Sequence, residues 1–418
     1  MSLRLPSSAR SAACAGLWLA SACAFEAPVN AVRPPPVAPA PSAKAGSGGA
    51  GGAAGAAAGT SAPVIRTSTL DPKLVLSDSC RVHSHNSALV PSNLLFVVDR
   101  SGSMVCNPPP ITSSEKCEAE GVREDPSMLS KWQLTTSALA AAVNALPDTA
   151  SVGLSYFSND NQCGVSSTPN VPLGKAVKPQ LNALQASLAG IQPAGSTPLV
   201  GATMLAYKYL QSAAQSGSIS GNSYVVVITD GEQSDRCSDT TFCKNAVECS
   251  DLLIQEGARA ANPDVNIRTF VMGVPGSEHG RTMLSRLARA GGTAASNCVP
   301  EQGNCHFDVT RAPDLSTGLA TALQTITGRA LTCYFDVPKD APGGVDLTRL
   351  NVVYTPHAGA ARVIPQDLSA PCDRGADGWQ YDTERKLIRL CGNTCAAVRN
   401  DRGASVTVVL GCPVIGPD

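Results

Sequence analysis

The stretch NLLFVVDRSGSM, residues 93–104, is the part of the sequence that decides the fold. Apolar residues from Leu94 to Val98 are followed at once by Asp99 and, at alternate positions, by Ser101 and Ser103. A continuous apolar run of this kind indicates a strand that is buried on both faces of a sheet. Its abrupt polar end is compatible with a turn, a nucleophile, a phosphatase site or a metal-binding loop, and the rest of the chain decides between them.

Short apolar runs alternate with longer helical patterns along the middle of the chain. Strands are expected at 94–99, 151–158, 223–230, 265–274 and 305–310, and helices at 131–146, 176–191, 198–214, 246–262, 279–292 and 315–331. Repeated alternation of strand and helix predicts an α/β fold with a doubly wound, mainly parallel sheet flanked by helices.

Polar residues follow the predicted strands where a ligand would bind. Ligands of an open parallel sheet lie beyond the carboxyl ends of its strands. Asp99 stands at one such end, Asp230 ends the run SYVVVITD, and Thr197 lies in the loop PAGSTPL before a helix. Together with Ser101 and Ser103, these residues would bring two carboxylates and three hydroxyls to one edge. Such oxygen ligands suit a hard cation, Mg²⁺ first, with Mn²⁺ or Ca²⁺ possible.

The order of these motifs resembles that of von Willebrand factor type A domains. The chain has D-R-S-G-S after the first strand, G-S-T-P-L downstream and T-D-G at the end of a later strand. The resemblance covers residues 92–330. It implies that this segment is a type A domain whose carboxyl edge carries a metal-ion-dependent adhesion site.

The resemblance also implies a role for each residue of the site. Ser101 and Ser103 would bind Mg²⁺ through their hydroxyls, and Thr197 would bind it directly or through water. Asp99 and Asp230 would act largely through waters that they orient. The remaining position on the ion would accept an acidic side chain from a protein or cell-surface partner, so the function implied is adhesion-type binding.

Catalysis is the rival chemistry, and the motifs do not favour it. A phosphatase of the haloacid dehalogenase type resembles D-x-D-x-T/V, but Ser101 stands where the second acid belongs. No G-x-S-x-G elbow surrounds either serine, and none of the five histidines has a supporting motif. We therefore expect a binding protein and not an enzyme. The remaining alternative is an exported structural module with a vestigial metal site.

Cysteine usage indicates export. Of the 16 cysteines, Cys14 and Cys23 fall in or at the end of a signal sequence. The others are even in number and could close as disulfides, which persist in exported proteins. They are Cys80, Cys106, Cys117, Cys163, Cys237, Cys243, Cys249, Cys298, Cys305, Cys333, Cys372, Cys391, Cys395 and Cys412. Zinc is the rival explanation, but paired C-x-x-C motifs are missing from the sequence.

The N-terminus has the features of a bacterial export signal. Residues 1–22 combine a basic start with a short apolar segment, as in a signal peptide. L-A-S-A-C ending at Cys23 resembles a lipobox, so a lipid anchor on Cys23 is expected, with ordinary secretion as the alternative. Residues 23–75 are rich in Pro, Gly and Ala and are expected to be a disordered tether. The expected location is the cell envelope: outer membrane, periplasm or cell surface.

Two further segments are distinctive. Residues 331–418 contain short strand-like runs between turn residues and five cysteines, and are expected to form a small disulfide-rich β module. An insertion at 105–130 follows the first motif, and a Cys106–Cys117 bridge there would either shape access to the metal or simply staple a surface loop. The acids Glu232, Asp235 and Asp239 lie on the same rim, where they would either tune the metal site or form a solvated loop, and we expect the solvated loop.

Net charge argues against nucleic acid as a partner. The chain carries 32 basic and 33 acidic residues, a net charge of −1, and has no basic run. Binding to nucleic acid depends on concentrated positive charge. The expected partners are therefore a carboxylate-bearing protein or surface ligand and, through the lipid anchor, a membrane.

Overall fold

The computed structural model describes most of the chain after residue 66. The described residues are 67–68, 71–76, 83–87, 90–238, 243–295, 297–331, 333–337, 346–372, 375–383, 386–401, 404–411 and 413–414. The chain divides into a unit of residues 1–60 and a unit of residues 61–418. The predicted signal peptide, Cys23, most of the predicted tether, Cys80, Asp239 and Cys412 lie outside the described residues.

A six-stranded sheet forms the centre of residues 92–330. Its strands lie in the order β4-β3-β2-β5-β6-β7, and all neighbours are parallel except β3 and β4. The bounds are β2 (Ser92–Asp99), β3 (Ala150–Phe157), β4 (Val171–Lys175), β5 (Asn222–Thr229), β6 (Ile267–Gly273) and β7 (Phe307–Asp308). The predicted doubly wound, mainly parallel sheet is confirmed.

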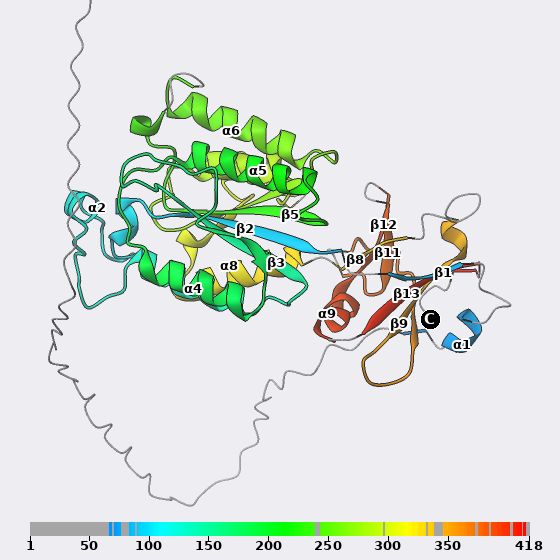
Figure 1. Cartoon of the computed structure of the whole chain (residues 1–418). Coiled ribbons are helices and arrows are strands. Elements are labelled where there is room, and N and C mark those ends of the chain that lie inside the picture. The colour runs from blue at the N-terminus through cyan, green and yellow to red at the C-terminus, as the bar shows by residue number, and fades with distance from the viewer. Residues whose placement is uncertain are drawn as a thin grey trace, which may run out of the picture. The chain divides into compact units, whose positions relative to one another are not determined.

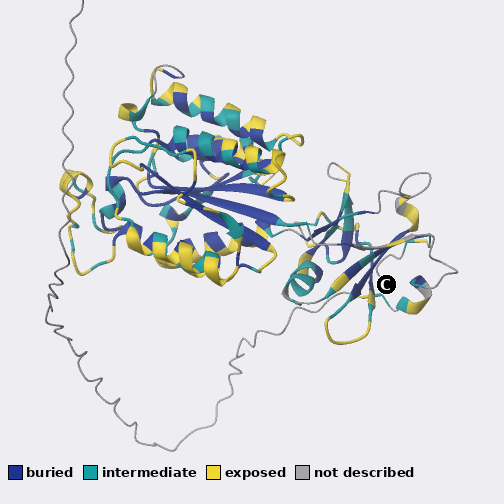
Figure 2. Cartoon of the chain, in the orientation of Figure 1, coloured by how far each residue is buried: buried dark blue, intermediate teal, exposed yellow. Residues whose placement is uncertain are grey.

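Helices cover both faces of this sheet (Figure 1). Phe96 of β2 faces a core shared with α3 (Lys131–Asn144), α4 (Lys178–Gly190) and α8 (Leu315–Ala330). Leu95 and Val97 face the opposite core, shared with α5 (Leu199–Gln215), α6 (Ala246–Ala261) and α7 (Arg281–Ala290). The central strands are buried throughout, as the unbroken apolar runs predict (Figure 2). Among the described helices, none is long and apolar enough to cross a membrane.

The start of α3 is fixed by a reciprocal cap. The Ser130 hydroxyl accepts a hydrogen bond from the backbone N–H of Gln133 at 3.1 Å, and the Gln133 side chain accepts one from the N–H of Ser130 at 2.9 Å. This capping box satisfies two backbone donors that the helix itself leaves free. It places Lys131 at the first helical position, where its backbone N–H donates to Cys106 O at 3.0 Å.

Residues 331–418 form a β module, which also recruits a strand from before the type A segment. One antiparallel sheet has the order β1-β13-β9-β10 and a second has the order β11-β12-β8. The bounds are β1 (His83–Ser87), β8 (Tyr334–Phe335), β9 (Leu350–Thr355), β10 (Arg362–Ile364), β11 (Trp379–Asp382), β12 (Leu387–Leu390), β13 (Ser405–Leu410) and α9 (Gly392–Asn400). Trp379 lies at the centre of the module's apolar core.

A short helix lies inside the range predicted to be tether. α1 spans Pro72–Val75, and Val75 is buried against Val353, Val363 and Val409 of the module. This difference from the predicted disordered linker has a simple cause, because one apolar residue finds a place on a sheet formed much later in the sequence. The remaining short helices are α2 (Glu115–Glu120), η1 (Gly102–Val105), η2 (Asp235–Cys237), η3 (Pro300–Gln302), η4 (Val309–Arg311) and η5 (Leu347–Arg349).

The described cysteines are joined in disulfides. The pairs are Cys106–Cys117, Cys163–Cys237, Cys243–Cys249, Cys298–Cys305, Cys333–Cys395 and Cys372–Cys391. For these residues the prediction of disulfides in place of zinc is confirmed. Bridges in such number are typical of proteins that work in an oxidising, extracellular or surface environment.

Candidate metal centre

The carboxyl ends of β2 and β5 bring the two predicted acids to one edge of the sheet. The strands are parallel neighbours, with Val98 opposite Ile228. Asp99 is the last residue of β2, and Asp230 directly follows β5. Both side chains are buried. The predicted convergence of these acids is therefore present in the fold.

Asp99 is held by hydrogen bonds to both of its oxygens. Oδ1 accepts a bond from the backbone N–H of Ser101 at 2.8 Å, and Oδ2 accepts one from the Thr229 hydroxyl at 2.7 Å. Burial, and secondly the charge of Asp230, raise the pKa of Asp99 to about 7, although the bonds from Ser101 and Thr229 favour the ionised form. The two acids thus share a site that is short of positive charge.

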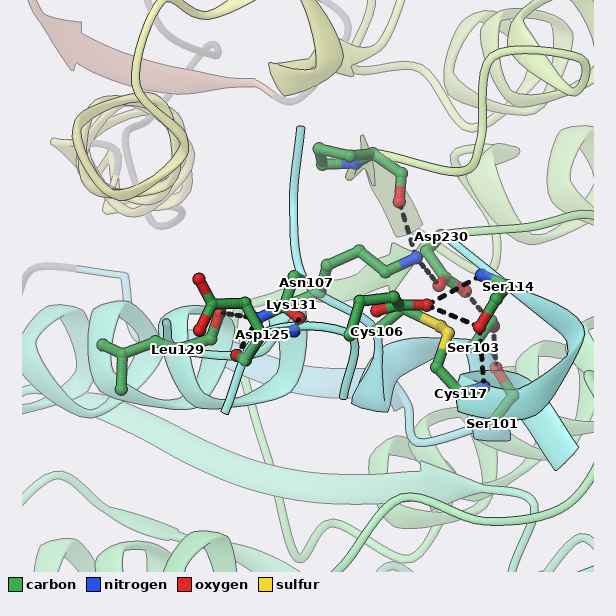
Figure 3. The surroundings of a disulfide bond; sticks show 12 residues. Ser101, Ser103, Cys106, Asn107, Ser114, Cys117, Asp125, Leu129, Lys131 and Asp230 are labelled. Carbon is green, nitrogen blue, oxygen red and sulfur yellow. Dashed lines mark hydrogen bonds and ion pairs between the residues drawn. A yellow bond between two sulfur atoms is a disulfide. The ribbon is translucent and has the colours of Figure 1, made fainter. Parts of the chain in front are cut away.

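The two serines lie between the acids. Ser101 directly precedes the short helix η1, and Ser103 lies in the single turn of that helix. Their hydroxyl oxygens are 3.0 Å apart, and Ser103 Oγ donates a hydrogen bond to Asp230 Oδ1 at 2.9 Å. Figure 3 shows Ser101, Ser103 and Asp230 converging. A chain of oxygen atoms therefore runs from the loop after β2 to the loop after β5.

The loop that carries Thr197 is tied to the other two loops through its backbone. Ala194 N–H donates to Arg100 O at 2.7 Å, and Gly102 N–H donates to Gly195 O at 3.0 Å. On its other side, Thr197 O accepts a bond from Ser234 N–H at 3.0 Å. Thr197 itself is half-buried and stands two residues before α5. Asp99, the last residue of β2, and the other four predicted residues, on three loops that are hydrogen-bonded to one another, therefore lie at one edge of the sheet.

Two glycines allow this close packing. Gly195 has a φ of +88°, and a Cβ there would lie 2.2 Å from Ser158 Oγ. A Cβ on Gly102 would lie 2.0 Å from the carbonyl oxygen of Glu118, which belongs to α2 in the insertion. Only glycine avoids these clashes without a shift of the backbone. The insertion therefore rests directly on the loop that carries Ser101 and Ser103.

Disulfides surround the edge. Cys106–Cys117 closes the insertion beside η1, as Figure 3 shows, and Lys131 N–H donates to Cys106 O at 3.0 Å. Cys163–Cys237 joins the loop after β3 to η2, which follows β5. Two loops of the rim are thus covalently linked, which keeps them close together.

Lys131 is the residue of this site that sequence reasoning missed. Its Nζ lies 2.5 Å from Asp230 Oδ2 and donates to the carbonyl oxygen of Pro275 at 2.9 Å. The lysine side chain is 3% exposed. Figure 3 shows it reaching across to Asp230. Its position after the N-cap Ser130 is the one available signal in the sequence, and that signal does not reveal where the side chain points.

Other predicted rim residues have ordinary roles. Asp235 Oδ1 accepts a hydrogen bond from Ala246 N–H at 3.1 Å, next to the start of α6. Glu232 is exposed, as expected of a solvated loop. His306 is buried and its Nδ1 lies 2.7 Å from Ser285 Oγ, so this histidine is paired within the fold and not with Ser101 or Ser103.

The residues present fit a hard divalent cation. Carboxylates and hydroxyls are the ligands that Mg²⁺ prefers, and here both kinds gather at one edge. Two neighbouring buried acids also need more positive charge than the single Lys131 ammonium supplies. Burial is the main cause of the raised pKa of Asp99, and the negative charge of Asp230 adds to it.

Comparison with known proteins identifies the family of the central segment. The model of the von Willebrand factor type A domain matches residues 93–302, half of the chain. A search of curated proteins with this chain found no match.

Solved structures with a similar arrangement include proteins of several kinds. The PilB minor pilin from Streptococcus sanguinis has a TM-score of 0.40 and 14% identity, covering 58% of this chain and 62% of that one. The pilus adhesin SpaC from Lactobacillus rhamnosus GG has a TM-score of 0.41 and 13% identity, covering 78% and 40%. A von Willebrand factor type A protein from Catenulispora acidiphila has a TM-score of 0.33 and 11% identity, covering 80% and 60%. The chain therefore spans less than two thirds of the length of each of these structures.

Proposed function

The chain belongs to the von Willebrand factor type A domain family, and we propose that it is an adhesion-type binding protein of the bacterial cell envelope. We propose that it captures a protein or surface ligand through Mg²⁺, with Mn²⁺ or Ca²⁺ as possible substitutes. An acidic residue of the partner would complete the coordination of the ion. The expected lipid anchor on Cys23 would hold the protein at a membrane.

A single observation carries this proposal. Ser103 Oγ lies 3.0 Å from Ser101 Oγ and 2.9 Å from Asp230 Oδ1, beside the buried Asp99. Thr197 is on the adjoining loop. These five residues would hold the ion, which would supply a Lewis-acidic position open to a carboxylate. Because the hydroxyls are neutral, they leave the ion with charge that an anionic partner can balance.

The arrangement supports binding in preference to catalysis. A nucleophile needs a base or an acid within hydrogen-bond reach. Asp230 does lie within reach of the Ser103 hydroxyl, but its second oxygen is paired with the ammonium of Lys131. The second acid of the phosphatase motif is replaced by Ser101. We therefore propose no hydrolytic step for this edge.

A structural module without bound metal is the second candidate, and Lys131 favours it. The ammonium of Lys131 already neutralises Asp230, which could keep the site folded when no metal is bound.

Metal titration decides between the two candidates. We expect the purified chain to bind Mg²⁺ in isothermal titration calorimetry and Ser103→Ala to bind it at least about tenfold more weakly, since a direct ligand is lost. Ser216→Ala, at an exposed hydroxyl after α5, is the matched control and should bind like the wild type.

Ligand capture is tested separately. We expect a partner in cell-surface extracts to be retained by the chain with Mg²⁺ and to be lost with EDTA or with Asp230→Ala. Retention under all four combinations of protein and additive would remove the metal from the mechanism.

A further inference from the structure

Lys131 is a buried cation placed against one of the two acids of the metal centre. Lysine is almost never buried unless it is paired. Here the ammonium donates to Asp230 Oδ2 and to the carbonyl oxygen of Pro275 at 2.9 Å (Figure 3). The contact with Pro275, two residues after β6, fixes the ammonium between two loops. The capping box at Ser130 fixes the backbone from which the side chain starts.

The charge of the edge follows from three residues. Asp99 and Asp230 carry two negative charges when both are ionised, and Lys131 carries one positive charge. Arg100 directly follows Asp99 in the sequence but points away from the two acids, because its guanidinium donates to the carbonyl oxygens of Ser158 and Gln192. With both acids ionised, these three residues therefore sum to one negative charge, and a divalent cation would change that sum to one positive charge.

Both oxygens of Asp230 already have partners. Oδ1 accepts from Ser103 Oγ at 2.9 Å and Oδ2 from the ammonium of Lys131. A cation that takes its place among Asp99, Ser101 and Ser103 must share Asp230 with this ammonium. Two positive charges held a few ångströms apart in a buried site repel strongly, since little water screens them.

We propose that Lys131 is a built-in counter-cation, which holds Asp230 in place in the metal-free protein and lowers the affinity of the site for divalent cations. This inference rests on the proposed function, because it concerns metal binding at the same edge. It adds a residue that tunes the site without being a ligand. It also explains how two buried acids can coexist there before metal is bound.

Removal of the charge is the test. We expect the full chain with Lys131→Met to bind Mg²⁺ at least about tenfold more tightly in calorimetry, because the repulsion is gone. Lys131→Arg, which keeps the charge, should stay close to the wild type. Lys178→Met is the matched control, since Lys178 also stands at the first position of a helix, α4, but is exposed. Its affinity should not change.

Thermal unfolding gives a readout that does not depend on a ligand. In EDTA, Lys131→Met should unfold at a lower temperature than the wild type, because Asp230 loses its counter-charge. Saturating Mg²⁺ should raise the unfolding temperature of this variant by more than that of the wild type. If Lys131→Met does not fold without metal, Lys131→Gln keeps a donor to Asp230 without the charge and should show the same gain in affinity.

The outcomes separate this inference from the proposed function. A folded variant without the charge that binds Mg²⁺ no more tightly than the wild type overturns the role of Lys131. A wild type that binds no Mg²⁺, beside a Lys131→Met variant that does, supports the role of Lys131 and contradicts metal-dependent capture by the natural chain. Absence of binding by both proteins overturns both proposals.

Discussion

At the scale of single residues, the candidate site holds two buried carboxylates. Both oxygens of each carboxylate accept hydrogen bonds, but only one lysine balances their negative charge. Asp99 is bonded to Ser101 and Thr229, and Asp230 to Ser103 and Lys131. Burial of an ionised group is costly unless opposite charge accompanies it. Lys131 balances the charge of one of the two acids. A bound cation would balance the other, and we therefore expect it to stabilise the site.

His306 gives a pH prediction that is independent of the metal. Burial lowers the pKa of His306 to about 4, from 6.5 for an exposed histidine, and the nearby Asp308 offsets this shift only in part. Above pH 6.5 both the folded and the unfolded chain hold the histidine neutral, so its contribution to stability is fully present. Between pH 6.5 and pH 4 only the unfolded chain takes up the proton, and that contribution is lost, by up to roughly 3 kcal/mol.

Urea unfolding of the wild type and of His306→Gln from pH 7.5 to pH 4 measures this contribution. Acids that titrate in both proteins cancel in the comparison. We expect the free energy of unfolding of the wild type to fall more steeply than that of the variant as the pH is lowered. Parallel curves for the two proteins would show that His306 is not a buried neutral group.

Residues with a motif could be predicted from the sequence, and residues without one could not. Asp99, Ser101 and Ser103 follow a buried strand, and Thr197 and Asp230 stand in loops of recognisable sequence. Lys131 has the same local setting as any lysine at a helix start. Its burial depends on which loops of the folded chain surround it, and one-dimensional spacing does not contain that information.

At the scale of secondary-structure elements, burial decides which segments the sequence reveals. β2 and β5 are buried at every residue, and their apolar runs identify them. β4 (VPLGK) is an antiparallel edge strand with exposed positions and a proline, so no strand was predicted there. β7 has two residues, shorter than its predicted range, because it pairs only with the end of β6.

The disulfide that joins two elements of the rim allows the next prediction. Cys163–Cys237 spans 74 residues of sequence, so its loss frees a long loop in the unfolded chain and should lower the free energy of unfolding by about 4 kcal/mol. Gln162, beside Cys163, accepts a hydrogen bond from Ser196 N–H at 2.8 Å, next to Thr197. We therefore also expect Cys163→Ser/Cys237→Ser to bind Mg²⁺ several-fold more weakly, because the Thr197 loop is held less firmly.

A second disulfide provides the control. Cys298–Cys305 spans 7 residues and lies between α7 and β7, outside the three loops that carry the predicted metal residues. Cys298→Ser/Cys305→Ser should lose roughly 2 kcal/mol, in keeping with its short loop, and should keep the wild-type affinity for Mg²⁺. Chemical denaturation and calorimetry measure both quantities. Equal loss of Mg²⁺ affinity in the two double variants would contradict a specific role for the rim bridge.

At the scale of the whole molecule, the β module is assembled from both sides of the type A domain. β1 pairs with β13 from His83 opposite Leu410 to Ser87 opposite Val406, although the type A domain separates the two strands in sequence. The sequence HSHNS of β1 has no apolar alternation, so its strand conformation is set by the partner strand and not by its own pattern. Prediction from sequence therefore places the module at 331–418 and cannot find its first strand.

Removal of β1 should destabilise the module and leave the type A domain folded. A chain that begins at residue 90 lacks both β1 and Val75, so β13 becomes an edge strand and a buried apolar contact is lost. With Trp132→Phe in the background, the fluorescence of Trp379, buried in the module, reports on this part of the protein. Compared with a chain that begins at residue 67, we expect the Trp379 transition to shift to lower urea concentration. The helices lie mostly in the type A domain, and their unfolding, followed by circular dichroism, should occur at the same urea concentration in both chains. A Trp379 transition that is the same in both chains would mean that the module folds without its first strand.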